Sequence, residues 1–286
     1  MKLAASNIAW PASERDAAYA LLKSRGVLGL EIAPALFLPN SADPFVPTEK
    51  EVAQARDALH AAGLELVSMQ SLLFGVKGAS LFEGGEALKL FRKGLHRAIT
   101  LAGRLSIPNL VFGSPRQRTI PDHMSAAEAE AIAIDVFRDL GDAAGSVDTR
   151  IGIEFNPLAY GTNFLNDLPQ AQAFLEKVDH PSVALTFDIG AMHMNRQFDE
   201  IEYFASQARK YISHVHISEP HLAPAPADRT EAAKVLSVMK KIGYQGWFSI
   251  EMQAIPSGSL SELERSLDKL ILAASTAMER TNADRV

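Results

Sequence analysis

The sequence predicts an α/β fold, a single (β/α)8 barrel, on the basis of three observations. Apolar segments of strand length alternate with longer amphipathic segments about every 30 residues, as in parallel strands joined by helical crossovers. Eight such units follow one another without a break in composition, and eight units close a barrel. A doubly wound open sheet is the competing architecture, but no glycine-rich phosphate-binding turn follows the first strand.

The expected strands are short apolar runs, and the expected helices are the amphipathic segments between them. The strands cover residues 2–8, 27–33, 64–70, 109–113, 150–155, 183–188, 212–218 and 247–252. The helices cover residues 13–25, 48–62, 86–105, 125–145, 168–178, 199–210, 229–242 and 259–278. Ser13, Thr48 and Ser125 each precede acidic residues within one turn, which is typical of helix N-caps.

The longest expected loops follow the second and third strands, at residues 34–47 and 71–85. Both lie on the C-terminal side of their strands, where barrel enzymes place their sites. A polar segment from about residue 279 is expected to be a frayed tail. Residues 1–286 are therefore expected to form one barrel domain.

Composition narrows the class of protein. The chain is 47% hydrophobic and 22% charged, and it has no cysteine, which excludes disulfides, thiolate zinc sites and a cysteine nucleophile. A net charge of −6 without a dense Lys/Arg tract argues against nucleic acid as a partner. There is no signal-peptide pattern and no apolar run near the ~20 residues that span a bilayer. We expect a cytoplasmic protein with a small-molecule partner and no membrane partner; homo-oligomerisation is left open.

Polar residues recur at the ends of the last four expected strands. Side chains alternate along a strand, so parity separates the barrel interior from the side that faces the helices. In these strands the bulky apolar side chains share one parity and must face the helices, which turns the small and polar side chains inward. The inward side chains expected to meet at the C-terminal mouth are Glu154, Asp188, His216 and Glu251.

Three carboxylates and an imidazole in a small volume repel and desolvate one another unless a positive charge lies among them. One divalent metal ion is the simplest solution. A nitrogen and three oxygen donors without sulfur suit Mn²⁺, Mg²⁺ or Co²⁺ and also admit Zn²⁺. The alternative interpretation is a set of separate ion-pairing residues at strand ends.

The motifs around these four residues resemble the xylose isomerase-like TIM barrels, specifically the sugar phosphate isomerase/epimerase group. The resemblance is carried by "GIEFNP", "TFDIGAM", "HVHISEP" and "FSIEM" in this order and spacing. The segments "GLEIAP", "VFGSPRQR" and "NPLAYGTNF" add to it, so that it covers essentially the whole chain.

This resemblance implies a metal-dependent isomerase or epimerase of a sugar, a sugar phosphate or a related polyol-ketone. Glu154, Asp188, His216 and Glu251 would hold one divalent metal ion, and Glu154 and Glu251 would also be the catalytic acid/base pair. Proton removal next to a carbonyl requires a positioned base and a Lewis acid. Two bases on opposite faces allow epimerisation, whereas one base that serves adjacent carbons allows isomerisation.

The sequence also departs from the pattern of the characterised ketose 3-epimerases. They carry a substrate-contacting histidine three residues after the metal-binding aspartate, where this chain has Ala191, with His193 two positions further on. They also carry an arginine six residues after the metal-binding histidine, where this chain has Leu222. The substrate contacts are therefore expected to differ from theirs.

Further residues are predicted to contact substrate or to support the metal ligands. Arg116, with Arg118 beside it, follows the fourth strand and suits an anion such as phosphate or carboxylate. His214 lies one layer deeper than His216 and is predicted to support the ligands from the second coordination layer rather than to bind the metal. The remaining predicted substrate contacts are Glu31, Asn156, His193 and Glu219.

Three other functions compete with the isomerase or epimerase. A dehydratase of the inosose type would use the same metal site and the same proton abstraction. A non-catalytic binding barrel is a second alternative, although an unused carboxylate cluster is costly. An apurinic endonuclease needs additional histidine ligands on early strands and a basic DNA-facing surface, and the sequence shows neither.

Overall fold

Eight parallel strands close into a barrel, as the repeat predicts. The structure is a computed structural model that describes residues 1–283. Each strand pairs with the next along the chain, and the last pairs with the first, which excludes the open sheet. The strands are β1 Lys2–Ser6, β2 Gly29–Ile32, β3 Glu65–Met69, β4 Leu110–Phe112, β5 Ile151–Glu154, β6 Val183–Asp188, β7 Ile212–Ser218 and β8 Trp247–Glu251.

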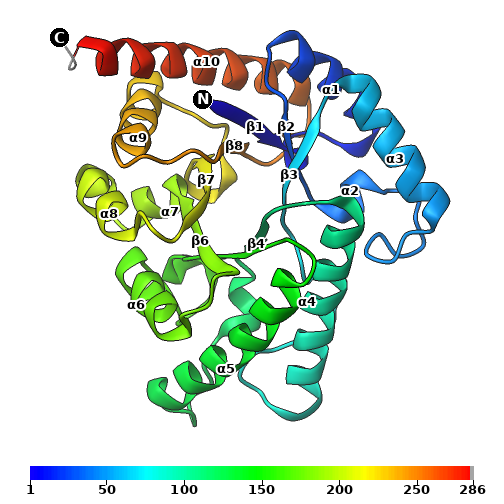
Figure 1. Ribbon diagram of the computed structural model, residues 1–286, viewed down its shortest axis with the longest axis vertical. Helices are drawn as coiled ribbons and strands as arrows, with labels where there is room; N and C mark the ends of the chain where they lie inside the picture. The colour runs from blue at the N-terminus through cyan, green and yellow to red at the C-terminus, as the bar shows by residue number, and fades with distance from the viewer. Residues whose placement is uncertain (284–286) are drawn as a thin grey trace.

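Helices surround the strands (Figure 1). The eight expected helices are α1 Arg15–Ser24, α3 Glu49–Ala62, α4 Gly85–Leu105, α5 Ala126–Gly145, α6 Leu168–Val178, α8 Ile201–Ala208, α9 Arg229–Lys241 and α10 Ser259–Ala283. Two short helices that were not expected, α2 Pro34–Phe37 and α7 Ile189–Met194, follow β2 and β6. Short 3-10 helices at the mouth include η3 Pro115–Arg118, η4 Leu158–Tyr160 and η6 Pro220–Leu222.

Two of the expected helix caps form and one does not. Thr48 and Ser125 each accept the backbone N–H three residues on, and the glutamates there complete capping boxes. Ser13 instead lies in a 3-10 turn, and α1 begins at Arg15 without a side-chain cap. Acidic residues near a helix start are therefore not sufficient to identify the cap.

The helix-facing side of the strands packs in an aromatic and aliphatic core. Phe112 of β4 contacts Phe91 of α4 and Phe137 of α5 edge to face, at centroid distances of 5.7 and 5.0 Å. Burying each ring contributes roughly 1.5–3 kcal/mol. Ile151 and Ile153 of β5 are fully buried as well. With these side chains turned outward, the alternate positions must point into the barrel.

The last helix, α10, continues beyond its expected boundary at residue 278. The polar segment expected as a tail from about residue 279 begins within α10, which continues to Ala283. Residues 284–286 lie outside the described part of the chain. Within residues 1–283, no helix combines the length and the apolar character needed to cross a membrane.

Candidate metal centre

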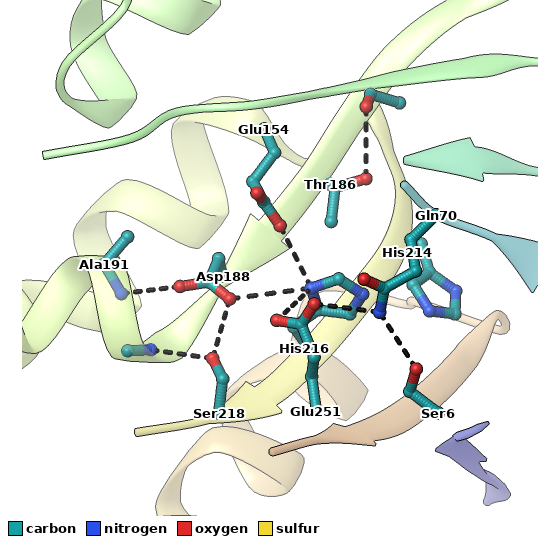
Figure 2. Close-up of polar contacts among 12 residues, drawn as sticks. Ser6, Gln70, Glu154, Thr186, Asp188, Ala191, His214, His216, Ser218 and Glu251 are labelled. Atoms are coloured by element: carbon teal, nitrogen blue, oxygen red, sulfur yellow. Dashed lines mark hydrogen bonds and ion pairs between the residues drawn. The ribbon is translucent and has the colours of Figure 1, made fainter. Parts of the chain in front are cut away.

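Four side chains from consecutive strands meet at the C-terminal mouth of the barrel (Figure 2). The Nδ1 atom of His216 lies 3.0 Å from Glu154 Oε1, 3.5 Å from Asp188 Oδ2 and 3.1 Å from Glu251 Oε2. Glu154, Asp188 and Glu251 each end a strand, and His216 lies two residues before the end of β7. The structure thus brings together all four predicted metal ligands.

The donor arrangement fits one divalent cation. A single ring nitrogen of His216 cannot donate hydrogen bonds to three carboxylates at once. Donors bound about 2.1 Å from one metal ion in octahedral geometry lie roughly 3 Å apart, as these atoms do. The four residues form a group that can hold a metal ion.

Burial and neighbouring charges shift the pKa of Glu251 and of His216. Burial, reinforced by the charges of Glu154 and Asp188 and opposed by His216, raises the pKa of Glu251 to about 7. Burial alone would lower the pKa of His216, but the carboxylates of Glu251 and Glu31 raise it well above its ordinary value. A bound cation would relieve this repulsion by replacing the shared protons.

Neighbouring side chains fix the orientation of two of the carboxylates. Asn156 donates its amide hydrogen to Glu154 Oε2 at 3.0 Å, which leaves Oε1 toward His216. Ser218 donates to Asp188 Oδ2 at 2.7 Å, and the backbone N–H of Ala191 donates to Oδ1. Such supporting contacts hold metal ligands in place and tune their basicity.

Glu31 and Gln70 connect His216 to Glu251 beneath the mouth. Glu31 Oε2 lies 3.0 Å from His216 Nε2, and Glu31 Oε1 accepts from Gln70 Nε2 at 3.0 Å. The same Gln70 nitrogen lies 3.0 Å from Glu251 Oε1 and 2.9 Å from Ser6 Oγ. Glu31, a predicted substrate contact, is fully buried and is not among the residues that line the cavity at the mouth.

His214 lies deeper in the barrel, as its position on β7 predicts. Its Nε2 atom is 3.1 Å from Glu31 Oε2, and its ring centre is 5.2 Å from that of His216. It is outside the group of four donors at the mouth. His214 is therefore placed to support Glu31, which in turn contacts His216.

A cavity of about 510 Å³ opens above the four donors. Two of the predicted substrate contacts, Asn156 and Glu219, line it. Glu219 Oε1 accepts the backbone N–H of Ala227 at 2.8 Å, which holds this carboxylate at the rim.

Three other predicted substrate contacts do not reach the cavity. Arg116 is exposed on η3 and outside the lining. Arg118 is fully buried, and its Nη2 atom donates to the Glu154 carbonyl and to Asn156 Oδ1, both at 2.7 Å. His193 lies on α7, because its segment forms a helix rather than a returning loop, and it stacks on Phe198 at 4.1 Å.

Sequence reasoning missed several residues that line the cavity, among them Gln70, Tyr160 and His221. The backbone N–H of His221 donates to the Tyr160 hydroxyl at 3.1 Å, which joins the loops after β5 and β7. Parity would have identified Gln70, since it shares the inward side with Ser68 of β3. No local pattern in the sequence signals the contact between Tyr160 and His221.

The fold and the site together define a class of (β/α)8 barrels with a carboxylate-rich group that can hold a metal ion at the C-terminal strand ends. Residues 19–271 match the family model described as "Xylose isomerase-like TIM barrel", and the chain belongs to this family.

Sugar epimerases are among the similar proteins. A curated L-ribulose 3-epimerase from Methylomonas sp. (strain DH-1) is 26% identical over 127 residues, or 44% of this chain, and the match spans 43% of that protein. A solved L-ribulose 3-epimerase superposes with a TM-score of 0.81 at 14% identity, covering 99% of this chain and 98% of its own. The 3-keto-D-glucoside 4-epimerase of E. coli superposes at 0.75 with 18% identity, covering 94% and 98%. The structural likenesses show the fold alone.

Proposed function

We propose that the protein is a divalent-metal-dependent isomerase or epimerase of a sugar, a sugar phosphate or a related polyol-ketone. The observation that carries the proposal is the position of two glutamates at one cavity. Glu154 and Glu251 each present one carboxylate oxygen to His216 Nδ1, at 3.0 and 3.1 Å, and both line the cavity. The epimerases among the similar proteins support this chemistry.

In the proposed site Glu154, Asp188, His216 and Glu251 hold the metal ion, with Mn²⁺, Mg²⁺ or Co²⁺ the best matches to the oxygen-rich donors and Zn²⁺ also admissible. The bound ion would polarise the substrate carbonyl and stabilise the charge that develops when a neighbouring proton leaves.

Glu154 and Glu251 would exchange protons with the carbons beside the carbonyl. Asn156 and Gln70 donate to the other oxygens of these glutamates and so orient them. Proton transfer by both glutamates on opposite faces would give epimerisation.

The substrate would lie in the cavity with its hydroxyl groups toward polar side chains. Asn156 and Glu219 line the cavity and are the proposed hydrogen-bonding contacts. Glu31, Arg116 and His193 have no part in this proposal, because they do not reach the cavity.

Solvent exchange tests the proposal. The metal-loaded protein would be incubated in D₂O with a panel of ketoses, keto-glycosides and sugar phosphates, and deuterium located by NMR. We expect incorporation at a carbon next to the carbonyl and its loss in Glu251→Gln. Glu86→Gln on the exposed surface of α4 is the matched control and should exchange normally.

Two outcomes would contradict the proposal. Loss of water from the substrate, seen as a new unsaturated product, would assign the site to a dehydratase. Absence of exchange with every sugar, in protein that binds metal stoichiometrically, would favour a non-catalytic binding barrel.

A further inference from the structure

The cavity above the four donors is strongly acidic. Four carboxylates line it, from Glu154, Asp188, Glu219 and Glu251, and none of its described lining residues is a lysine or an arginine. With a divalent cation bound, its two positive charges offset two of the three carboxylates at the metal. One negative charge remains there, and Glu219 adds another at the rim.

The two arginines of η3, which follows β4, are not available to neutralise this charge. Arg116 is exposed on η3 and outside the lining. Arg118 is fully buried and uses its Nη2 atom for the Glu154 carbonyl and Asn156 Oδ1. A phosphate group in this cavity would lack an arginine to bind it through two hydrogen bonds, and it would be repelled by the carboxylate of Glu219.

The upper wall of the cavity is largely apolar. The 3-10 helices η3, η4 and η6 follow three strand ends, and each contributes one such side chain to the lining: Pro115, Tyr160 and Leu222. The hydrogen bond from the His221 N–H to the Tyr160 hydroxyl holds two of these helices together. The wall is therefore built before a substrate arrives.

The cavity is also larger than a free sugar requires. Its volume of about 510 Å³ corresponds to roughly 17 water-sized volumes. A free hexose has fewer non-hydrogen atoms than the number of water molecules that the cavity could hold. With a free hexose bound, the space beside Pro115, Tyr160 and Leu222 would therefore remain partly filled by water. Apolar walls gain free energy when an apolar group replaces that water.

We propose that the substrate is an uncharged sugar or polyol-ketone that carries an apolar substituent, such as an alkyl or aryl aglycone. Its reacting carbons would lie at Glu154 and Glu251, and the substituent would pack on Pro115, Tyr160 and Leu222. This inference deepens the proposed proton-transfer function and rests on it.

A matched set of substrates tests this inference. One sugar whose ketone is not at the anomeric carbon, such as a 3-keto-hexose, would be supplied free, as its phosphate ester and as its phenyl glycoside, and kcat/KM for deuterium incorporation measured for each. We expect the phenyl glycoside to exceed the phosphate ester by at least about tenfold, with the free sugar between them. A phosphate ester processed as well as the glycoside would overturn the inference and leave the proposed function intact. No exchange with any of the three would overturn the proposed function itself.

A charge introduced into the apolar wall provides the second test. Leu222→Arg should raise kcat/KM for the phosphate ester and lower it for the phenyl glycoside, changing their ratio by at least about tenfold. Leu158→Arg is the matched control, because Leu158 is 68% exposed on η4 and does not line the cavity. Metal stoichiometry and melting temperature would establish that both variants fold. An unchanged ratio in folded Leu222→Arg would place the substituent elsewhere and overturn the inference.

Discussion

Glu31 Oε2 lies 3.0 Å from His216 Nε2, whereas the three carboxylates at the mouth face the other ring nitrogen, Nδ1. When the His216 ring is neutral, this contact favours the tautomer in which Nε2 carries the hydrogen and the lone pair of Nδ1 points toward the three carboxylates. Neither residue is exposed to solvent. Glu31 thus holds the His216 ring with Nδ1 toward the three carboxylates, without lining the cavity.

Glu31→Gln is expected to weaken metal binding by about 10- to 100-fold, because it removes the negative charge that orients the His216 ring and raises the basicity of its Nδ1 atom. Isothermal titration calorimetry with Mn²⁺ on chelator-treated protein measures the change. Glu65→Gln, on an exposed position of β3, is the control. Unaltered affinity in a folded Glu31→Gln protein would show that the contact has no influence on the metal site.

Parity along the strands was sufficient to place the four donors, because it depends only on which side chains face the helices. The parity of a residue does not tell how far below the mouth of the barrel its side chain lies. Glu31 points inward as expected, but in register it lies beside Ser6 and Ser68, and it contacts His216 from a buried position that does not line the cavity.

The loops were much less predictable than the strands. Arg118 and His193 are polar residues near strand ends, yet 3-10 and helical turns carry them into packed positions. Arg118 is held by Asn156, which is far from it in the sequence. His193 stacks on Phe198, and the two rings face each other only because the loop between them is helical at its start. The eight-unit repeat was readable because each unit has its own hydrophobic pattern.

Gly113 is a second position at which the structure predicts a measurable effect. A Cβ atom at this residue would lie 2.6 Å from Glu154 Oε2, the oxygen that accepts from Asn156. Gly113→Ala should displace this carboxylate and lower both metal affinity and the deuterium-exchange rate several-fold, with little change in melting temperature. Wild-type affinity and rate in the variant would show that the carboxylate adjusts without consequence.

Metal binding should release protons. In the metal-free protein the pKa of Glu251 is raised to about 7 and that of His216 is well above its ordinary value, and both must lose a proton to bind metal. Affinity should therefore fall as the pH drops through 7, where Glu251 becomes protonated. Above pH 7 Glu251 is already deprotonated in the metal-free protein. The number of protons released on metal binding should therefore decline there toward the contribution of His216 alone. Calorimetry in buffers of different ionisation enthalpy counts the protons, and pH-independent affinity between 6 and 8 would contradict this account.

Metal should also stabilise the fold through the same four donors. A ligand that binds only the native state adds about 2.7 kcal/mol to the free energy of unfolding at 100 times its Kd. For a barrel of this size we expect the melting temperature to rise by several degrees with Mn²⁺ and to fall back with chelator. Asp188→Asn removes one charged donor while keeping an oxygen that can accept the Ala191 N–H, so it should lose most of this rise without unfolding. Asp57→Asn on the exposed surface of α3 is the control and should retain it. An equal rise in Asp188→Asn and wild type would mean that the stabilising ion binds elsewhere.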